Sequence, residues 1–336
     1  MIAVGFNASL TITDPNSLVL FECEKPEVKG RDLLIRIEAI SVNPVDYKVR
    51  QNSLKNPQND MKVIGWDAAG IVEEVGEAVS LFSKGDRVFY AGDINKAGSN
   101  QEFQLVDERI VGFAPKAIKA PDAAAMPLTS LTVYELFFDR MRLNVEKDKG
   151  KSILIIGGAG GVGSVAIQIA KNILGLTVIA TASRTNSVNW CKNQGADFVV
   201  DHHSLLEEMQ AIGYGEVDFI VDFVDLNQYW NAIVELIKPQ GQVGSISDPS
   251  QMVNLRQLKG KSVSFHWELM FTRAMFQTED MHRQHKILNT IADWIDEGTI
   301  RSTKKETLYG LTADNLKKAH QLLESGTSIG KIVIDY

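Results

Sequence analysis

The residues best placed to do chemistry form a glycine-rich segment near the middle of the chain, residues 157–163. Within it, Gly158, Gly160 and Gly163 follow the G-x-G-x-x-G spacing, between the apolar strand Ser152–Ile156 and the start of a helix. The spacing predicts a tight turn at the first glycine, a close backbone approach to a diphosphate at the second, and helix-on-strand packing at the third. The residues expected to contact the phosphates are Gly158, Ala159, Gly160, Gly161, Val162 and Gly163.

The end of the next strand, Thr177–Thr181, indicates which dinucleotide binds. An NAD site places Asp or Glu here, where the carboxylate binds the ribose 2′-hydroxyl. This chain has Ser183 and Arg184 instead. A hydroxyl and a guanidinium bind a 2′-phosphate that a carboxylate would repel. We therefore expect NADPH as the cofactor, with Ser183 and Arg184 at its 2′-phosphate.

The elements that must position this loop predict an α/β fold with two kinds of domain. Short strands broken by turn residues dominate the first 120 residues. Farther along, apolar strands alternate with helices, which is typical of a parallel, doubly wound sheet covered on both faces. We expect a catalytic domain over 1–124, a dinucleotide domain over 125–270 and a completing segment over 271–336. A helix is expected over 123–139 and an outer strand over 262–264.

Composition narrows the possible functions. The 336 residues carry a net charge of −7, which disfavours nucleic acid and acidic membrane surfaces as partners. Two cysteines are too few for a disulfide framework and are expected as reduced thiols. The start of the chain does not follow the signal-peptide pattern, and no apolar run approaches the length of a membrane span. A cytoplasmic protein with a small-molecule substrate is expected.

Five motifs occur in a characteristic order along nearly the whole chain. They are Ser41–Asp46, Gly65–Val72, Gly85–Val88, Pro127–Tyr134 and Gly330–Val333. Together with the glycine loop they resemble the zinc-independent quinone oxidoreductases of the medium-chain dehydrogenase/reductase superfamily. The resemblance implies a GroES-like, partly open β-barrel built from both ends of the chain, with a Rossmann domain inserted between. It also implies an active site in the cleft between the two domains.

The resemblance also bears on zinc. Alcohol dehydrogenases of this superfamily bind a catalytic zinc through Cys, His and Cys, and the matching positions here hold Asn43, Trp66 and, at or beside the third, Leu128. The cysteines of a structural zinc lobe are missing too, because no Cys occurs between Cys23 and Cys191. Zinc needs three protein ligands in a catalytic site and four in a structural one. We therefore expect no metal.

Without zinc, hydride transfer suits acceptors that delocalise the developing negative charge, such as quinones, enones and 2-alkenals. The catalytic candidates are Asn43, which the resemblance puts at the substrate, and Lys48, at a position where many quinone oxidoreductases have Tyr. Asn43 has an alternative role in holding the turn before Pro44. Lys48 is either a proton donor or only a ribose contact or surface charge. Further cofactor contacts implied by the resemblance are Thr132, Ser245 and Lys331.

The leading hypothesis is an NADPH-dependent reductase of quinones or α,β-unsaturated carbonyls. The alternatives are a zinc-type alcohol dehydrogenase and a non-catalytic, NADPH-binding regulatory protein. The aromatic segment 265–271 follows the expected outer strand, and the resemblance implies that such edge strands pair across a homodimer. The same segment has a second interpretation as a lid over the substrate.

Overall fold

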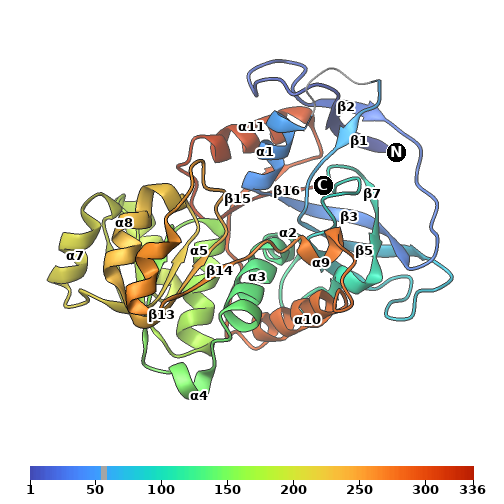
Figure 1. Ribbon diagram of the computed structural model, residues 1–336. Helices are drawn as coiled ribbons and strands as arrows, with labels where there is room; N and C mark the ends of the chain where they lie inside the picture. The colour runs from blue at the N-terminus through green and yellow to red at the C-terminus, as the bar shows by residue number, and fades with distance from the viewer. Residues whose placement is uncertain (54–58) are drawn as a thin grey trace. The chain divides into compact units, whose positions relative to one another are not determined.

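The structure, a computed structural model, describes residues 1–53 and 59–336. It divides into two compact units (Figure 1). Unit 1 contains residues 1–131 and 271–336, and unit 2 contains residues 132–270. The expected boundaries lie after residues 124 and 270, whereas the units divide after residues 131 and 270. None of the described helices combines the length and apolar character that crossing a bilayer requires.

Unit 1 is built on two β-sheets in the described part of the chain. Its larger sheet has the order β15-β16-β3-β5-β6-β8, with β7 also paired to β3, and its smaller sheet has the order β2-β1-β4. The strands are β1 (Ile2–Phe6), β2 (Val19–Glu22), β3 (Asp32–Val42), β4 (Lys62–Val63), β5 (Ala68–Val75), β6 (Arg87–Tyr90), β7 (Phe103–Asp107), β8 (Val111–Phe113), β15 (Lys304–Tyr309) and β16 (Lys331–Asp335).

Strand β3 organises the larger sheet because it is long and largely buried. One edge of β3 pairs with β5, while the other edge pairs first with β7 and then, from Ala39 to Val42, with β16. A strand from the end of the chain thus completes a sheet begun near its start. This curved, partly open arrangement agrees with the predicted GroES-like barrel.

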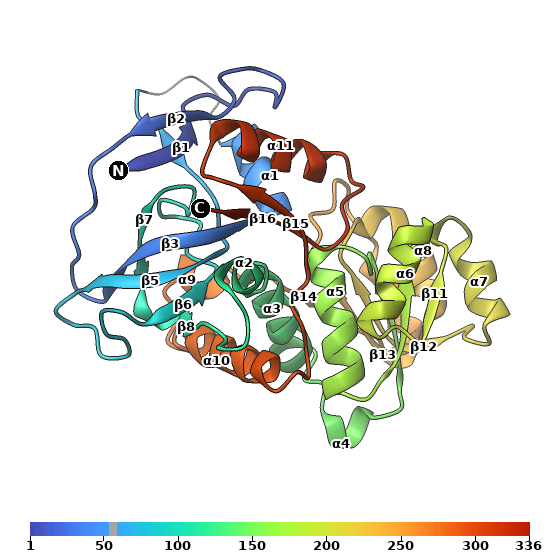
Figure 2. The ribbon, with the colours of Figure 1, turned by 180° about the vertical axis from the view of Figure 1, so that it is seen from behind.

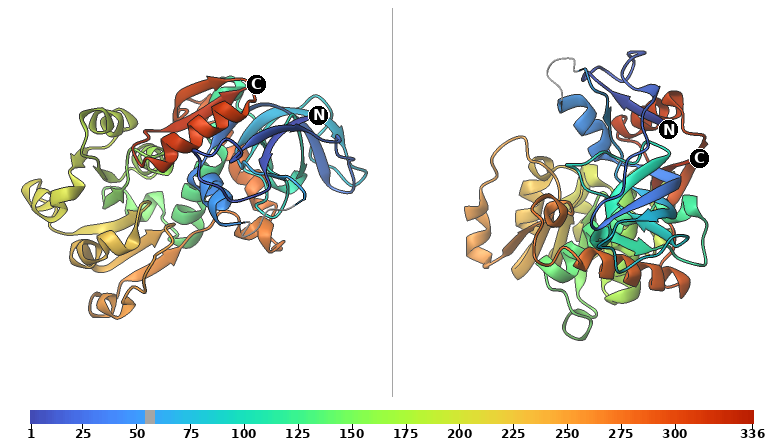
Figure 3. Two further views of the ribbon diagram at one scale, coloured as in Figure 1. Left: turned by 90° about the horizontal axis from the view of Figure 1, so that it is seen from above. Right: turned by 90° about the vertical axis from the view of Figure 1, so that its right-hand side faces the viewer.

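The helices of unit 1 include α1 (Pro44–Asn52), α2 (Ala120–Ala124), α9 (Thr272–Met275), α10 (Arg283–Asp296) and α11 (Ala313–Glu324). Helix α11, in red, lies beside α1, in blue (Figures 1 and 3). Arg50 of α1 is fully buried between them and donates from Nε to Nδ1 of His320 at 3.3 Å. It also pairs with Glu324, so a buried guanidinium fixes α1 against α11.

Unit 2 is a six-stranded parallel sheet in the order β11-β10-β9-β12-β13-β14. The strands are β9 (Ser152–Ile156), β10 (Thr177–Thr181), β11 (Phe198–Val200), β12 (Val217–Asp222), β13 (Ile237–Ser245) and β14 (Ser264–Trp267). The helices include α5 (Gly161–Gln168), α6 (Thr185–Gln194), α7 (Leu205–Ala211) and α8 (Leu226–Leu236).

Helices cover both faces of this sheet. Figure 1 shows α8 in front of the strands, and Figure 2, seen from behind, shows α5 and α6 over the opposite face. On the α8 side, Leu154, Ile220 and Val243 from three neighbouring strands pack with Trp230 and Ile233 in one buried cluster. This confirms the predicted doubly wound sheet, whose strands are apolar because both faces are buried.

Two expected elements differ in the structure. The outer strand is Ser264–Trp267 rather than 262–264, because Ser262 has a φ of 52° and cannot continue a strand. The expected helix over 123–139 is instead α2, then α3 (Pro127–Tyr134), then the π-helical stretch η2 (Glu135–Arg140). Pro127 separates α2 from α3 because its ring restricts the preceding residue and it donates no backbone hydrogen bond.

Candidate functional site

The glycine-rich segment forms the loop between β9 and α5. Gly157 has a φ of 87°, a left-handed conformation that favours glycine, so the turn leaving β9 is made there. Gly158 is a central residue of the same turn, which the N–H of Gly160 closes by donating to the carbonyl of Gly157 at 3.2 Å, in agreement with the tight turn expected at the first glycine of the motif. A Cβ on Gly158 would lie 2.7 Å from the Cβ of Ala180, so this glycine allows close packing on β10. Gly163 allows the expected close packing, because its Cβ would lie 2.2 Å from the carbonyl oxygen of Gly157.

The amino end of α5 has the character of an anion site. The helix begins at Gly161 with Gly160 as the N-cap residue. Because Gly160 has no side chain, it cannot cap the first backbone N–H groups, which carry the positive end of the helix dipole. A loop in which Cβ atoms would collide, followed by uncapped N–H groups, fits the diphosphate of a dinucleotide. The contacts predicted from Gly158 to Gly163 remain predictions.

The carboxyl ends of the parallel strands bring most cofactor candidates to one edge of unit 2. The loop 157–163 follows β9, Ser183 and Arg184 follow β10, and Ser245 ends β13. Ligands of open α/β sheets bind outside the carboxyl ends of the strands. Thr181 reinforces the edge, because its hydroxyl accepts a hydrogen bond from the N–H of Gly157 at 2.9 Å.

A buried carboxylate at this edge was not predicted from the sequence. Asp222 ends β12, and its Oδ2 accepts hydrogen bonds from the hydroxyls of Ser247 at 2.7 Å and Ser245 at 3.1 Å. Its Oδ1 accepts from the N–H groups of Val224 and Asp225. Burial raises the pKa of Asp222, and these donors oppose the rise. Its place directly after an apolar strand was the signal in the sequence.

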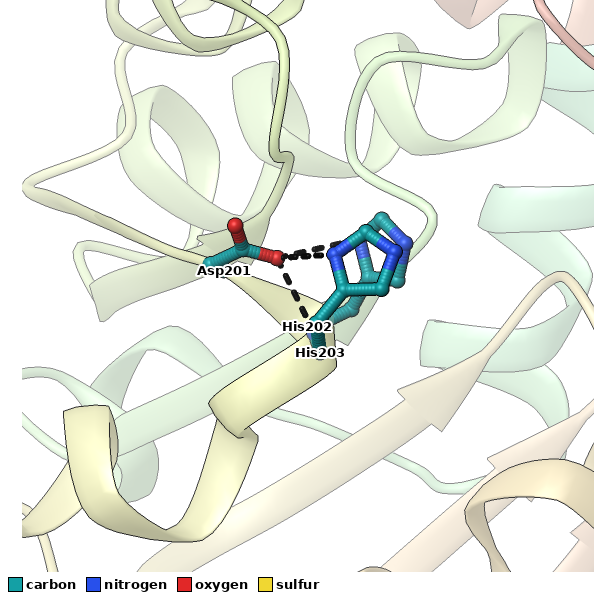
Figure 4. A group of neighbouring side chains, drawn as sticks. All are labelled: Asp201, His202 and His203. Carbon is teal, nitrogen blue, oxygen red and sulfur yellow. Dashed lines mark hydrogen bonds and ion pairs between the residues drawn. The ribbon is translucent and has the colours of Figure 1, made fainter.

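Arg184 begins α6 as its N-cap residue and is exposed. Its charge acts on His202, whose pKa is lowered by partial burial and by the neighbouring His203 and Arg184, against the opposing effect of Asp201. Figure 4 shows the two imidazoles side by side, with the carboxylate of Asp201 directed at them. Oδ1 of Asp201 lies 2.6 Å from Nδ1 of His203 and accepts the His203 N–H at 2.9 Å.

In unit 1, Asn43 and Lys331 meet around a carboxylate that sequence reasoning also missed. The Asn43 amide donates to Oδ2 of Asp67 at 2.8 Å, and Nζ of Lys331 lies 2.9 Å from the same oxygen. Nζ also donates to Oδ1 of Asn43. Burial raises the pKa of Asp67, while the ammonium, the amide and the N–H of Leu128 oppose that rise. Both side chains are therefore engaged within unit 1.

A second buried carboxylate stands at the start of α1. Asp46 is 1% exposed, and its Oδ2 accepts the backbone N–H of Asn43 at 2.9 Å. Its Oδ1 is buried without a hydrogen-bond partner among the described residues. Burial raises the pKa of Asp46 to about 7, with a smaller rise from Asp67, opposed by the Asn43 N–H and by Lys331.

The remaining predicted residues lie elsewhere. Lys48 is exposed on α1, and Thr132 is buried in α3. The structure thus brings the Gly-loop candidates, Ser183, Arg184 and Ser245 to one edge of unit 2. It joins Asn43 to Lys331 in unit 1.

The residues at the family's zinc positions do not fit the metal. Asn43 is committed to Asp67, the indole N–H of Trp66 donates to the carbonyl of Asp93 at 3.2 Å, and Leu128 has no ligand atom in its side chain. Among residues 1–53 and 59–336, the one His/Cys/Asp/Glu group close enough to hold an ion is Asp201, His202 and His203. That group belongs to unit 2 and includes none of the positions named above.

The sequence matches two known domain families. Residues 29–129 match the alcohol dehydrogenase GroES-like domain, and residues 194–334 match the zinc-binding dehydrogenases. A zinc-type alcohol dehydrogenase-like protein of Staphylococcus epidermidis (strain ATCC 12228 / FDA PCI 1200) is 41% identical, covering 100% of this chain and 99% of the relative. The chloroplastic NADPH-dependent alkenal/one oxidoreductase of Arabidopsis thaliana is 33% identical, covering 67% of this chain and 58% of the relative.

Solved structures agree over the full length. A Rhizobium etli CFN 42 protein assigned to the zinc-dependent alcohol dehydrogenases is 49% identical, with a TM-score of 0.95 over 100% of this chain and 98% of the other. A mycobacterial protein in complex with NADPH is 26% identical, with a TM-score of 0.83 over 100% of both chains. The chain is therefore an oxidoreductase of the medium-chain dehydrogenase/reductase superfamily and belongs among its zinc-type alcohol dehydrogenase-like proteins.

Proposed function

We propose that this protein is an NADPH-dependent reductase of quinones or α,β-unsaturated carbonyls that works without zinc. The observation that carries the proposal is the glycine loop 157–163 with the uncapped N–H groups at the start of α5, on the same sheet edge as Arg184. The alkenal/one oxidoreductase from Arabidopsis and the NADPH complex of the mycobacterial protein support it by family relationship.

The preference for NADPH rests on the charge that follows β10. Arg184 is exposed there, and His202 and His203 follow the neighbouring strand β11. The carboxylate of Asp201 in this region is bound by the ring and the backbone N–H of His203. A charge-assisted hydrogen bond contributes about 1.5–3 kcal/mol, so Arg184 would favour NADPH by about tenfold to a hundredfold. Ser183 and the histidines would add polar contacts to the 2′-phosphate.

The acceptor class follows from the residues at the zinc positions, because Asn43, Trp66 and Leu128 provide no ligand set for a metal ion that would act as a Lewis acid. Bound NADPH would supply a hydride from C4 of its nicotinamide. Without a metal to polarise an isolated carbonyl or alcohol, the acceptor must itself delocalise negative charge, as quinones and enones do. We propose Lys48 as the residue that delivers the proton, because an ammonium on an exposed helical surface can exchange protons with water. Asn43 would act by holding the turn into α1, and Thr132 and Ser245 would contact the cofactor.

The test is NADPH oxidation against a panel of quinones, enones, alkenals and simple alcohols, with and without a chelator. We expect turnover of the conjugated acceptors that the chelator leaves unchanged. Chelator-sensitive oxidation of simple alcohols with bound zinc would instead identify a zinc-type alcohol dehydrogenase. Tight NADPH binding without turnover of any acceptor would identify a non-catalytic cofactor-binding protein.

The cofactor preference has its own test in Arg184→Ala. We expect kcat/KM for NADPH to fall about tenfold or more while the value for NADH stays unchanged. Arg256→Ala is the matched control, because Arg256 is also an exposed arginine of unit 2. Equal losses with both cofactors would contradict a contact to the 2′-phosphate.

A further inference from the structure

Two imidazoles and a carboxylate gather on one short turn after β11. Asp201 follows the strand directly and caps the 3-10 turn η4 (His202–Ser204), because its Oδ1 accepts the backbone N–H of His203 at 2.9 Å. The capped turn places both histidine rings beside the same carboxylate. Nδ1 of His203 lies 2.6 Å from Oδ1, and Nδ1 of His202 lies 3.9 Å from it. Figure 4 shows these contacts converging on a single carboxylate oxygen.

This arrangement has the ligand types and the spacing of a metal site. One nitrogen of each ring and one carboxylate oxygen lie within 4.8 Å of one another. The two ring centroids are 4.1 Å apart and the rings are tilted by 34°, so the imidazoles lie side by side. Ligand atoms that are each about 2.1 Å from one ion lie about 3–3.5 Å from one another. Small rotations of the three side chains therefore bring their ligand atoms to the spacing that an ion requires.

The ligand side chains are accessible, while the backbone beneath them is fixed. The exposed fractions of the side chains are 35% for Asp201, 28% for His202 and 71% for His203. The N–H of Asp201 donates to Oε2 of Glu208 at 2.6 Å, which ties the start of the turn to α7. An ion from solvent can therefore reach three ligands whose backbone is already in place.

We propose that Asp201, His202 and His203 bind one divalent transition-metal ion of the zinc, nickel and copper(II) class, and that this ion tightens the binding of NADPH. Imidazole together with carboxylate suits these ions, whereas magnesium and calcium prefer oxygen ligands alone. The site is separate from the zinc positions of the superfamily, which all lie in unit 1.

The link to NADPH comes from the neighbouring strand. Strands β10 and β11 are parallel, with Thr181 in register with Val200. The N–H of Ala182 donates to the carbonyl of Val200 at 3.0 Å, so the pairing continues to the end of both strands. Arg184 and His202 follow within three residues and leave the same edge of the sheet. The inference rests on the contact of Arg184 with the 2′-phosphate that is part of the proposed function.

Charge and coordination explain why the ion and NADPH should bind together. Three protein ligands leave at least one position of the ion open, and a phosphate oxygen can fill it. A dication and a guanidinium on the same edge repel each other, and the 2′-phosphate between them relieves this repulsion. NADH has a hydroxyl in place of that phosphate and relieves none of it. The ion should therefore raise the affinity for NADPH without raising the affinity for NADH.

The first experiment titrates tag-free, metal-free protein with Ni²⁺ and with Zn²⁺ in a calorimeter. We expect one ion per chain with a Kd below about 100 µM, and a Kd at least about tenfold higher in His202→Gln and in His203→Gln. His282→Gln is the control, because His282 is an exposed histidine of unit 1. A Kd above about 100 µM in the wild type, or one that neither His202→Gln nor His203→Gln changes, would overturn the proposal.

Copper(II) provides a spectroscopic signature of the same ligands. Bound Cu²⁺ should show coupling to two ring nitrogens in its electron paramagnetic resonance spectrum, and to one nitrogen in each single histidine variant. Asp201→Asn keeps a side-chain oxygen that can cap η4 but removes the carboxylate charge. It should therefore weaken metal binding while leaving the melting temperature unchanged. A spectrum without histidine nitrogens would place the ion elsewhere and overturn the proposal.

The cofactor readout compares NADPH with NADH. With Ni²⁺ bound, we expect the Kd for NADPH to fall at least about fivefold and the Kd for NADH to stay within about twofold. The double variant His202→Gln, His203→Gln should bind NADPH equally well with and without the ion. A chelator should raise the KM for NADPH and leave kcat at saturating NADPH unchanged. A Kd for NADPH that bound Ni²⁺ leaves unchanged or raises would overturn the link to the cofactor.

The two proposals can fail separately. If Arg184→Ala affects NADPH and NADH equally in metal-free protein, the proposed contact with the 2′-phosphate is wrong. The calorimetry and the copper spectra still decide whether the metal site exists in that case. If metal-free protein prefers NADPH but binds no ion, the proposed function stands and the metal site is refuted.

Discussion

A Cβ atom on Gly163 would lie 2.2 Å from the carbonyl oxygen of Gly157, so the first turn of α5 is packed directly against the end of β9. Gly163→Ala should therefore push the helix away from the loop. We expect a loss of about 1–3 kcal/mol in the free energy of unfolding, together with weaker NADPH binding. Urea denaturation and fluorescence titration measure the two effects, and an unchanged stability would contradict the packing seen here.

Gly160 provides the contrasting case within the same loop. Its φ of −70° suits any residue, and the nearest atom to an added Cβ lies 3.5 Å away, which is ordinary contact. Gly160→Ala should leave stability within about 0.5 kcal/mol of wild type. If the diphosphate rests against this backbone, the added methyl group should still raise the Kd for NADPH about tenfold. An unchanged Kd for NADPH would show that the diphosphate does not contact the backbone at Gly160.

The hydrogen bonds of Asp222 should affect both the stability of the protein and its affinity for NADPH. Asp222→Ala leaves the hydroxyls of Ser245 and Ser247 and two backbone N–H groups without their acceptor. We expect a loss of at least about 2 kcal/mol in unfolding free energy and a weaker affinity for NADPH. Ser247→Ala should cost about 1 kcal/mol. Ser250→Ala, at an exposed hydroxyl, is the control.

Stability should depend on pH through Asp46, whose pKa burial raises to about 7. The folded protein therefore binds this proton more tightly than the unfolded chain, so unfolding free energy falls as pH rises between about 4 and 7. A shift of about three pKa units corresponds to about 4 kcal/mol as an upper value. Asp46→Asn should remove most of this slope in urea denaturation at several pH values.

The control for that experiment is Asp314→Asn, since Asp314 is an exposed aspartate in the first turn of α11. It should keep the wild-type slope. If Asp46→Asn also keeps it, Asp46 is ionised in the folded protein throughout the range and another group causes the pH dependence.

The family resemblance implies a homodimer that pairs through the edge strand β14, and we propose this assembly for the protein. This strand ends the sheet order of unit 2, and Trp267 and Leu269 are 47% and 52% exposed. We expect sedimentation equilibrium to give twice the chain mass for the wild type, and Trp267→Asp to dissociate the dimer. Phe276→Asp is the control, because Phe276 is 72% exposed in unit 1. A monomeric wild type would refute the proposal.

Local sequence patterns predicted β9 and β10 well because both strands are compact apolar runs, whereas β13 contains Lys238, Pro239 and Gln240. Ser152–Ile156 and Thr177–Thr181 have the expected bounds. The conformation of each glycine was harder to predict. Residues 157–163 contain more glycines than the motif needs, and the spacing alone does not say which of them adopts a positive φ. A Cβ on Gly157 would lie 2.6 Å from Cγ2 of Val224, a residue of the segment after β12 that lies far away in the sequence.

The site in unit 1 shows the limit of sequence patterns more clearly. Asn43 and Lys331 were both candidates, but separate motifs suggested separate partners for them. The residue that joins them, Asp67, has no local pattern that distinguishes it from an exposed aspartate. Its burial arises when β16 pairs with β3 and brings Lys331 against it, a contact between distant segments that periodicity does not encode.

The pairing of β16 with β3 also has a consequence for synthesis on the ribosome. Unit 2 is one uninterrupted stretch, so all of its strands have emerged once residue 270 has left the exit tunnel. The sheet of unit 1 still lacks β15 and β16 at that moment, and the Lys331 ammonium that pairs with the Asp67 carboxylate has not yet been made. Nascent chains should therefore acquire a protease-resistant middle before they acquire a protease-resistant amino-terminal region.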